Sequence, residues 1–547
     1  MLVGSPSLGG AYLLDTRNQR LISLQTTPGA ATCAVSGVSV SASPPSVTSG
    51  TASSLTATVD GTTGCPTGVT WSASPAGGTL TTSGNTATFS APAAGTYTIT
   101  ATSVADPTRS GSVTVTVTGA AGCAAPSGTV VTHTANITLS ETWAGNGVTH
   151  SVPGSITIGS AAVVTIQPCA YVSMGANATI TVNGTAKLVA AGTSPSQSIS
   201  FIRANSSQPW GILRGASATS LIDLSYTTLQ GGGAFGGLYA NSVIAAFGNG
   251  YFVTPVPVVR VNNVLIDSPQ GGGVYFDAGG AFTSDSTGLT VQGAPGYVLS
   301  MGSMSLTTVP TGNYSASSNA LPMVNVVGTF NMFGDVTIHN YLPVRIQSGG
   351  FTVAPSGGNT APVTLTIEPG ARLLFPKASA TTPGARVIFG TNGNPPNNLV
   401  GVLNAQGTAA APIIFTSGEA APDAGDWVGL WLDTATGSRL DHVVIEYAGA
   451  PSGIIAGNCK PTGTPDSAAL LIGDFSAQYV PPANLLTNST LRLSAGFGID
   501  AFWWATTFNA PDLTAGNTFQ GNTFCAQTYN ALVPPATCGT NIGCTAP

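Results

Sequence analysis

The sequence predicts an all-β protein in which a β-sandwich precedes a long stack of parallel strands. Its apolar residues come in short runs of Val, Ile, Leu and Thr broken by Gly, Asn, Ser and Pro, and no apolar period near 3.6 residues persists over the length of a helix. One stretch of the chain also occurs twice, which is the signature of stacked architectures. Together these observations favour strands that pile up along one axis.

The repeated stretch runs from Trp210 to Gly233 and again from Trp427 to Ala450. We align the copies, with one residue inserted after Trp427, at these pairs: Gly211 on Gly429, Asp223 on Asp441, Gly231 on Gly449 and, upstream, Phe201 on Phe415. In this alignment Asp223 and Asp441 are turn residues. The two tryptophans recur at one turn, so we expect them to be structural wedges.

Segments on both sides of the repeated stretch correspond as well, so two halves share one ground plan. A coil that climbs by one strand spacing, about 4.8 Å, stacks like residues on like and buries their aliphatic side chains. We therefore predict a right-handed parallel β-helix built from two related halves, residues 126–322 and 323–547. Disulfides are expected to brace the C-terminal end.

Residues 33–119 form a separate unit in this interpretation. Strand-like runs follow one another at intervals of about ten residues, the spacing of a β-sandwich. They are GVSVSAS, SLTATVD, GVTWSAS, TATFSAP, GTYTITATS and GSVTVTVTG. Trp71, in the third run, is expected to lie in the core of the sandwich.

Several segments resemble bacterial extracellular β-helix repeat proteins: APIIFTS (411–417), GDWVGL (425–430), SRLDHVVIEYAG (438–449) and NTFQGNTF (517–524). The resemblance covers residues 126–547 and concerns the fold. Residues 33–119 resemble a bacterial immunoglobulin-like domain, in which GTYTITA with Tyr97 is similar to the tyrosine corner. Proteins of this kind include adhesins, other surface proteins and polysaccharide-active enzymes, so the resemblance implies an extracellular location and leaves the activity open.

The amino-acid composition disfavours several classes of binding partner. Only 6% of the residues are charged, against about a quarter in ordinary domains. The net charge of −6 disfavours nucleic acid and anionic membranes. A surface of Ser, Thr, Asn and Gly repels its own copies weakly, so association into a homo-oligomer or filament is compatible with it. No apolar run reaches the roughly eighteen residues that span a bilayer.

Residues 1–32 are expected to be an N-terminal extension. They lack the basic n-region and long apolar h-region of a secretory signal, which indicates a mature or truncated chain. Two interpretations stay open. Residues 11–25 are a frayed leader or the remnant of a preceding domain, or they form a strand that caps the stack or docks on the edge of a neighbouring subunit.

Eight cysteines form an even set without a CxxC pair, which disfavours metal ligation and favours disulfides in an extracytoplasmic protein. Pairing of nearest neighbours predicts four bridges: Cys33–Cys65, Cys123–Cys169, Cys459–Cys525 and Cys538–Cys544. The last three would brace the two ends of the stack, where an array frays first.

Little in the sequence predicts catalysis. β-Helical lyases need clustered acids with an Arg or Lys base, but the lysines here have no acidic run beside them. Hydrolases of the polygalacturonase type need paired aspartates, and no Asp-Asp pair occurs. The richest acid cluster is Asp423, Asp426, Asp433, Asp441, His442 and Glu446. We predict no enzymatic activity, no cofactor and no metal; the alternative is a lyase or glycoside hydrolase acting on extracellular polysaccharide in a groove of the helix.

Binding is the better prediction. Trp503 and Trp504 are adjacent in AFWWATTF, so on a strand at least one of them leaves the core and can stack on a sugar ring or a protein partner, unless a terminal coil or loop covers it. His442 and Glu446 are four residues apart, so a continuous strand presents them on one face. With Trp431, these residues make up the candidate binding surface.

We therefore expect a non-catalytic secreted or cell-surface protein, structural or adhesive, in which an immunoglobulin-like spacer carries a rigid β-helical rod. Its expected partners are an extracellular glycan, a surface protein or copies of itself. A groove lined by at least three converging acids and a Lys or Arg would favour the enzyme instead, whereas a smooth hydroxyl-rich face favours the binding protein.

Overall fold

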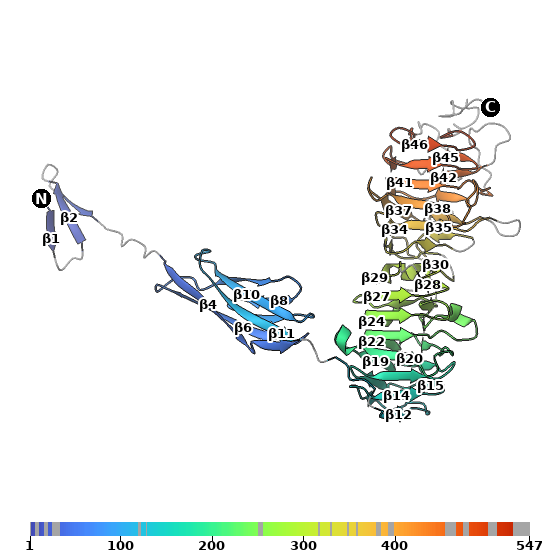
Figure 1. Ribbon diagram of the computed structural model, residues 1–547. Coiled ribbons are helices and arrows are strands. Elements are labelled where there is room, and N and C mark those ends of the chain that lie inside the picture. The colour runs from blue at the N-terminus through green and yellow to red at the C-terminus, as the bar shows by residue number, and fades with distance from the viewer. Residues whose placement is uncertain are drawn as a thin grey trace. The chain divides into compact units, whose positions relative to one another are not determined.

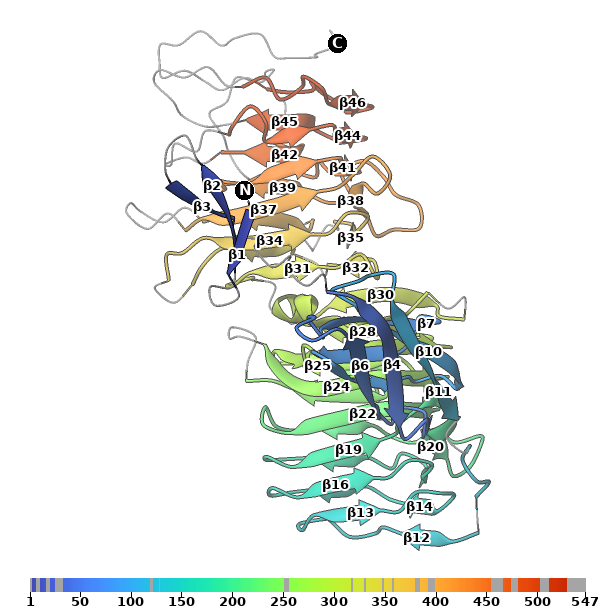
Figure 2. The same cartoon turned by 90° about the vertical axis from the view of Figure 1, so that its left-hand side faces the viewer.

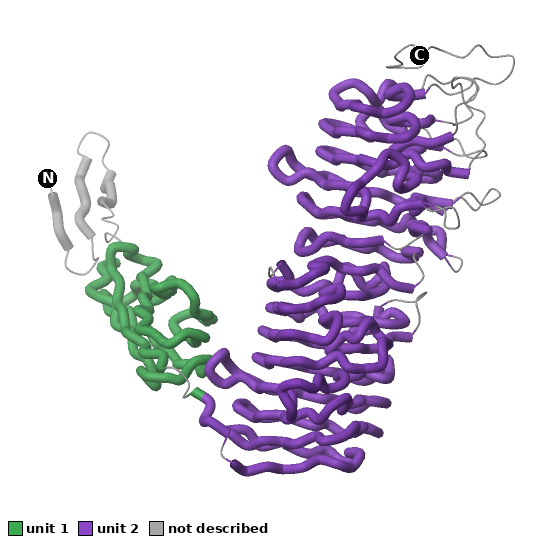
Figure 3. The backbone as a smooth tube through the Cα atoms, turned by 45° about the vertical axis from the view of Figure 1, so that its right-hand side comes forward, with its two compact units in different colours: residues 1–122 green, residues 123–547 purple. Residues whose placement is uncertain are grey.

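The computed structural model divides the chain into two compact units, residues 1–122 and 123–547 (Figure 3). It describes residues 33–118, 122–126, 128–249, 255–315, 318–328, 331–346, 349–356, 359–378, 384–391, 399–453, 466–473, 481–501 and 511–528. Of residues 1–32 only three strand backbones are described: β1 (Leu2–Ser5), β2 (Gly10–Asp15) and β3 (Arg20–Leu24), which form one antiparallel sheet.

Residues 35–118 fold into two four-stranded sheets. One contains β5 (Ser46–Thr48), β7 (Val69–Ser74), β10 (Gly95–Ser103) and β11 (Ser110–Thr118); the other contains β4 (Val35–Ser43), β6 (Ser53–Gly61), β8 (Thr79–Ser83) and β9 (Thr86–Ser90). Alternate residues of each strand point inward, so Ile99 and Val115 of one sheet share a core with Leu55 and Phe89 of the other. Every predicted run is a strand. The short β5 and the Thr-rich β8 are additional.

Two aromatic residues of this unit differ in their burial. The Tyr97 side chain is buried and its hydroxyl donates to the Ala93 carbonyl at 3.1 Å. Trp71 packs against the core but stays half-exposed, and its Nε1 donates to the Gly84 carbonyl at 3.0 Å. Trp71 thus contributes to the edge of the core, as predicted only in part, whereas Phe89 is fully buried.

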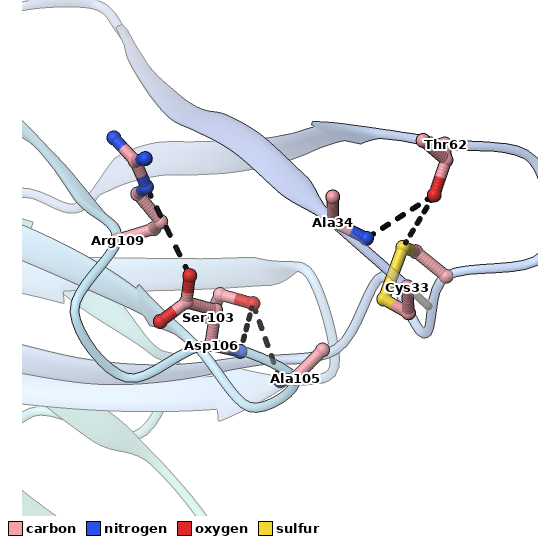
Figure 4. The surroundings of a disulfide bond; sticks show 8 residues. Cys33, Ala34, Thr62, Ser103, Ala105, Asp106 and Arg109 are labelled. Carbon is pink, nitrogen blue, oxygen red and sulfur yellow. Dashed lines mark hydrogen bonds and ion pairs between the residues drawn. A yellow bond between two sulfur atoms is a disulfide. The ribbon is translucent and has the colours of Figure 1, made fainter. Parts of the chain in front are cut away.

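Two predicted disulfides, Cys33–Cys65 and Cys123–Cys169, are present. In Figure 4 the hydroxyl of Thr62 lies beside the first bridge and accepts the Ala34 N–H at 3.2 Å. Cys525 is also disulfide-bonded, with a partner outside the described residues. The remaining cysteines of the predicted set lie outside the described residues, so their pairing stays a prediction: Cys459, Cys538 and Cys544.

The second unit is a solenoid-like stack of parallel strands (Figures 1 and 2). A twelve-stranded sheet contains β12 (Val130–Thr132), β13 (Glu141–Trp143), β14 (Thr149–Val152), β16 (Val163–Ile166), β17 (Tyr171–Met174), β19 (Lys187–Ala191), β20 (Ile199–Arg203), β22 (Leu221–Gln230), β24 (Val256–Asp267), β26 (Gly280–Phe282), β27 (Thr287–Gln292) and β29 (Thr311–Asn313).

A thirteen-stranded sheet runs through both halves of the unit. It contains β15 (Ile156–Ile158), β18 (Ile180–Val182), β21 (Leu213–Gly215), β23 (Ile244–Phe247), β25 (Val274–Asp277), β28 (Tyr297–Met301), β30 (Leu321–Val326), β32 (Val344–Arg345), β35 (Arg372–Phe375), β38 (Ile413–Ser417), β41 (Val443–Glu446), β44 (Thr490–Arg492) and β46 (Thr518–Gln520).

Two five-stranded sheets complete the second half. They contain β31 (Val336–Ile338), β34 (Val363–Ile367), β37 (Gly401–Gln406), β40 (Arg439–Asp441) and β43 (Leu486–Thr487), and then β33 (Phe351–Val353), β36 (Arg386–Phe389), β39 (Gly429–Leu432), β42 (Ala468–Ile472) and β45 (Phe497–Ala501). The described helices are short 3-10 turns, η1 (Pro195–Gln197), η2 (Leu238–Asn241) and η3 (Ser303–Thr308). None has the length and apolar character to cross a bilayer.

The core of the second unit consists of aliphatic side chains that stack on one another from coil to coil. Val164, Leu188, Ile222 and Val259 pair in succession from β16 to β24, and all four side chains are fully buried. Such ladders merge into one continuous aliphatic core. The alternation of polar and apolar residues within each short strand is sufficient to orient them, because successive strand residues point to opposite faces.

Phe201 and Phe415 lie in alike surroundings, as predicted. Phe201 is buried between Val172 and Leu229 of the adjacent coils, and Phe415 between Leu373 and Ile445. Their strands nevertheless belong to different sheets, β20 to the twelve-stranded sheet and β38 to the thirteen-stranded one. The strands that follow the two tryptophans, β21 and β39, also lie in different sheets. The second half thus repeats the first with each strand displaced by one sheet around the coil.

The hydrogen bonds correct the predicted alignment. Ala234 N–H donates to the Trp210 carbonyl and Ala450 N–H to the Trp427 carbonyl, and the glycine before each alanine donates to the residue after each tryptophan. The structural pairs are therefore Gly233 with Gly449 and Gly211 with Val428. The predicted pairs Gly231–Gly449 and Gly211–Gly429 are wrong, by two residues and by one, because the turns contain several glycines that letter matching does not distinguish.

The corrected alignment also changes which residue of the first half corresponds to Asp441. Ala190 pairs with Leu224, and Ala405 pairs with Leu440, so these two leucines are equivalent. Asp441 then takes the place of Ser225, His442 that of Tyr226 and Glu446 that of Gln230. Asp223 and Asp441 are not counterparts, and both lie in strands instead of turns.

Candidate functional site

Of the predicted binding residues, the structure describes Trp431, His442 and Glu446. Trp503 and Trp504 lie outside the described residues. Trp431 lies on β39, half-exposed, with its Nε1 donating to the Gly473 carbonyl at 3.0 Å and the Arg386 guanidinium 5.9 Å from its ring centre. Glu446 ends β41 of another sheet. Trp431 and Glu446 therefore belong to different sheets.

His442 and Glu446 are not presented together either. His442 has a left-handed backbone, with φ of 48°, and it separates β40 from β41. The strand alternation that would place the two side chains on one face is therefore interrupted. His442 Nδ1 lies 3.2 Å from Asp441, whereas Glu446 is bonded by Arg492 at 2.6 Å and by the Thr416 hydroxyl at 2.8 Å.

Three other acids of the predicted cluster, Asp423, Asp426 and Asp441, are held by local partners, and the fourth, Asp433, is buried. Lys377 Nζ contacts Asp423 at 2.7 Å and the buried Asp426 at 3.1 Å, and the bonds from these acids raise the pKa of Lys377. Partial burial opposes ionisation of Asp441, but hydrogen bonds from Thr487 and Asn488 lower its pKa overall. Each of these three carboxylates therefore serves a local structural bond.

A cleft of ≈490 Å³ lies where the first half gives way to the second. Here β29 ends one branch of the twelve-stranded sheet and β31 begins a five-stranded sheet, at mid-height in Figure 1. Hydroxyls, prolines and three aromatic rings line the cleft: Pro255, Pro257, Ala281, Phe282, Thr283, Ser284, Ser286, Thr307, Thr308, Val309, Pro310, Thr311, His339 and Tyr341. We call it the junction cleft.

His339 and Tyr341 form one wall of the junction cleft. Their rings stack at 5.0 Å with an interplanar angle of 14°, and Tyr341 is 38% exposed. His339 Nδ1 lies 2.8 Å from Glu368 Oε1, and its Nε2 lies 3.1 Å from the Thr307 carbonyl. Both ring nitrogens therefore face oxygen atoms, which fix the orientation of the imidazole. The wall thus presents a histidine–carboxylate contact beside the exposed ring of Tyr341.

An ion pair anchors another part of the lining, within residues 283–286. Thr283 in the lining donates to Asp285 at 2.7 Å, and Asp285 accepts Arg260 Nε at 2.7 Å. These two bonds, that from Arg260 first, lower the pKa of Asp285. Arg260 is also bonded by Asp223 at 3.0 Å. Hydroxyls are thus the polar groups left for a ligand on this side.

The sequence analysis missed the junction cleft. Its walls come from segments that are distant in the chain, and neither lies in the repeated stretch. One signal was available: His339 and Tyr341 are two residues apart in a chain with four histidines. No group of three or more metal-ligating side chains occurs in the part of the chain that the structure describes.

No protein family, characterised protein or solved structure matches the chain.

Proposed function

We propose that this chain is a non-catalytic extracellular surface protein, in which an immunoglobulin-like spacer carries a right-handed parallel β-helix that binds a neutral glycan in the junction cleft. The cleft carries the proposal. Its titratable side chain, His339, is engaged by Glu368, and the rest of its lining is hydroxyl, proline or apolar.

The chemistry of the cleft suits a sugar without charge. An exposed aromatic face stacks on the C–H side of a pyranose ring, while hydroxyls exchange hydrogen bonds with its hydroxyls. Tyr341 offers such a face, and Thr283, Ser284 and Thr311 offer hydroxyls. The described lining of the cleft contains no Asp, Glu, Lys or Arg side chain that would attract or repel a charged ligand.

Two further observations support the proposal, one on the extracellular location and one on association with another chain. The two disulfides are compatible with an oxidising compartment. At the first coil, β12 pairs with β14 alone and β13 with β16 alone among the described strands. Val130, Val131 and Leu139 of this coil are 58%, 42% and 80% exposed. An open edge with apolar side chains supports association with another chain.

A glycan array probed with the full-length protein tests the proposal. We expect binding to neutral glycans, and at least a tenfold loss in Tyr341→Ala. The matched control, Leu139→Ala, removes an exposed apolar side chain from the first coil and leaves glycan binding unchanged. Absence of neutral glycan binding, or equal binding by Tyr341→Ala, refutes the assignment of the cleft.

The His339–Glu368 contact favours one second candidate, an enzyme acting on polysaccharide. A histidine held by a carboxylate beside a cleft can act as a general acid or base. Incubation with neutral and acidic polysaccharides, followed by assays for new reducing ends and for unsaturated products, separates the two candidates. Turnover that disappears in His339→Gln would identify the enzyme.

A further inference from the structure

An arginine and four aromatic rings gather on the first half, away from the lining of the junction cleft. The Arg214 guanidinium carbon lies 6.0 Å from the ring centre of Tyr239 and 5.2 Å from that of Phe247. The rings of Phe235 and Tyr275 lie 5.7 and 5.6 Å from that of Tyr239. We call these five residues the Arg214 site. It joins one cation to several aromatic faces.

Among the described residues, Arg214 has no counterion. Its Nε is buried without a hydrogen-bond acceptor, and no carboxylate of the described residues pairs with its guanidinium. Two other half-buried arginines differ: Arg260 binds two aspartates and Arg492 binds Glu446. A buried donor left unsatisfied destabilises the protein, because it has lost its hydrogen bond to water. The terminal nitrogens of Arg214 are not enclosed, so they can meet an anion from solvent.

The turn that covers Arg214 is strained. Tyr239, Ala240 and Asn241 of η2 have left-handed φ values of 52°, 52° and 50°. A residue other than glycine is strained in this conformation unless its side chain compensates, because its Cβ approaches the following carbonyl oxygen. Asn241 does so in part, since its Oδ1 accepts the Gly237 N–H at 2.9 Å. Strain of this kind persists where the surrounding structure enforces it, and here it holds Tyr239 over the cation.

We propose that the Arg214 site binds a saccharide that carries a carboxylate. The two terminal nitrogens form a fork that matches the two oxygens of a carboxylate. The neighbouring aromatic faces stack on a sugar ring. The site supplies a single cation, which fits one carboxylate better than a multiply charged phosphate. Because the site lies on the first half and shares no residue with the junction cleft, this inference does not depend on the proposed function.

Titration calorimetry with two matched ligands tests the site. A galacturonic acid trisaccharide and the corresponding galactose trisaccharide differ only in the carboxylate at C6. We expect the full-length protein to bind the acidic sugar at least tenfold more tightly, with an affinity that falls as salt rises. Arg214→Gln removes this preference. Arg372→Gln, which alters an exposed arginine of β35 in the second half, leaves it intact.

Further variants separate charge from geometry. Arg214→Lys keeps the charge without the fork and retains only part of the preference, and Tyr239→Ala weakens both sugars. Circular dichroism and thermal melting establish that each variant is folded.

The proposal is overturned by equal affinity for the two sugars, by no binding of either, or by an unchanged preference in Arg214→Gln. Equal binding of an acidic peptide such as triglutamate overturns the saccharide assignment. Loss of acidic-sugar binding in Tyr341→Ala alone moves the site to the junction cleft and also overturns it.

Discussion

The two tryptophans that open the repeated segments make the same hydrogen bond within different packing. Trp210 Nε1 donates to the Gln230 carbonyl at 2.7 Å, and Trp427 Nε1 donates to the Glu446 carbonyl at 2.9 Å. Trp427 also stacks face to face on Phe375, with ring centres 4.0 Å apart and an interplanar angle of 8°. Among the described residues of the first half, the ring of Phe201 lies tilted beside Trp210, with ring centres 6.5 Å apart and an interplanar angle of 36°.

In the first half, a glycine packs against the ring of Trp210. A Cβ at Gly232 would lie 2.5 Å from the Trp210 ring, so the backbone itself packs against the indole. The corresponding residue of the second half is Ala448. The indole hydrogen bond is thus the shared element that sets the register, whereas the volume around the ring is filled differently in each half.

The outward position after each tryptophan differs as well. It carries Arg214 on β21 and Trp431 on β39, the fourth residue after the respective tryptophan. Both make a cation–aromatic contact, Arg214 with Tyr239 and Phe247, and Trp431 with Arg386. The same place on the coil therefore presents a cation in one half and an aromatic ring in the other.

Replacing the tryptophans should have the largest effect. Trp210→Ala and Trp427→Ala each remove a fully buried side chain, and we expect losses of about 4 kcal/mol in the free energy of unfolding. Trp427→Ala should cost about 1 kcal/mol more, since it also loses the Phe375 stack. Urea denaturation followed by circular dichroism measures both. Equal losses would mean that the stack contributes nothing.

Substitution of glycine probes the turn beside each tryptophan. A Cβ at Gly211 would lie 2.4 Å from Thr179 Oγ1, and one at Gly429, where φ is 132°, would lie 2.4 Å from the Ala468 carbonyl oxygen. We expect Gly429→Ala to lose about 3 kcal/mol and Gly211→Ala somewhat less, because only the former also strains the backbone. Gly154→Ala, in open space, serves as the control. Thermal melts that rank Gly154→Ala with the other two would contradict the packing argument.

Ion pairs should show a smaller contrast between the halves. Arg492→Gln leaves the Glu446 side chain, 11% exposed, without its cation, so we expect a loss of about 2 kcal/mol after allowance for the exposure of Arg492. Arg260→Gln removes bonds to Asp223 and Asp285, which are 23% and 62% exposed, and should cost less than about 1 kcal/mol. Denaturation in low and high salt should show that salt weakens only the Arg260 contribution.

The smallest effect is a pH dependence of the first coil. His133 Nε2 lies 3.0 Å from His150 Nδ1. Burial, with repulsion from His150, lowers the pKa of His133, and burial lowers that of His150, while Glu141 opposes both shifts. The unfolded chain therefore binds more protons, and stability is lost as the pH falls below about 6.5.

We expect the melting temperature to fall by about 1–2 °C more between pH 7.5 and 5.5 in the wild type than in a His133→Gln, His150→Gln double variant. Scanning calorimetry of both proteins measures the difference. Parallel curves would show that the histidine pair does not titrate in this range.

Much of the fold could be predicted from short segments of the sequence. The alternation within runs such as VVTI and YVSM corresponds to buried and half-exposed positions in β16 and β17. Each of the two confirmed disulfides joins two consecutive cysteines of the chain, 32 and 46 residues apart. These features were predictable because each depends on a short stretch of chain.

The register between the halves was beyond reach of sequence matching. Asp223 and Asp441 share a letter, but the hydrogen bonds of Trp210 and Trp427 make Ser225 the counterpart of Asp441. The left-handed residue His442 broke the strand whose continuity placed it beside Glu446. Single residues with unusual backbone angles leave no periodic trace in a sequence.

The sequence by itself determined that the chain is all β, that its core is a stack of aliphatic ladders and that two halves share a plan, since strand period and turn residues act over a few neighbours. Only the tertiary structure decided which sheet each half uses, where the junction cleft opens and why Arg214 lacks a counterion. Those features arise from contacts between distant coils, and their geometry depends on the summed lengths of every intervening turn.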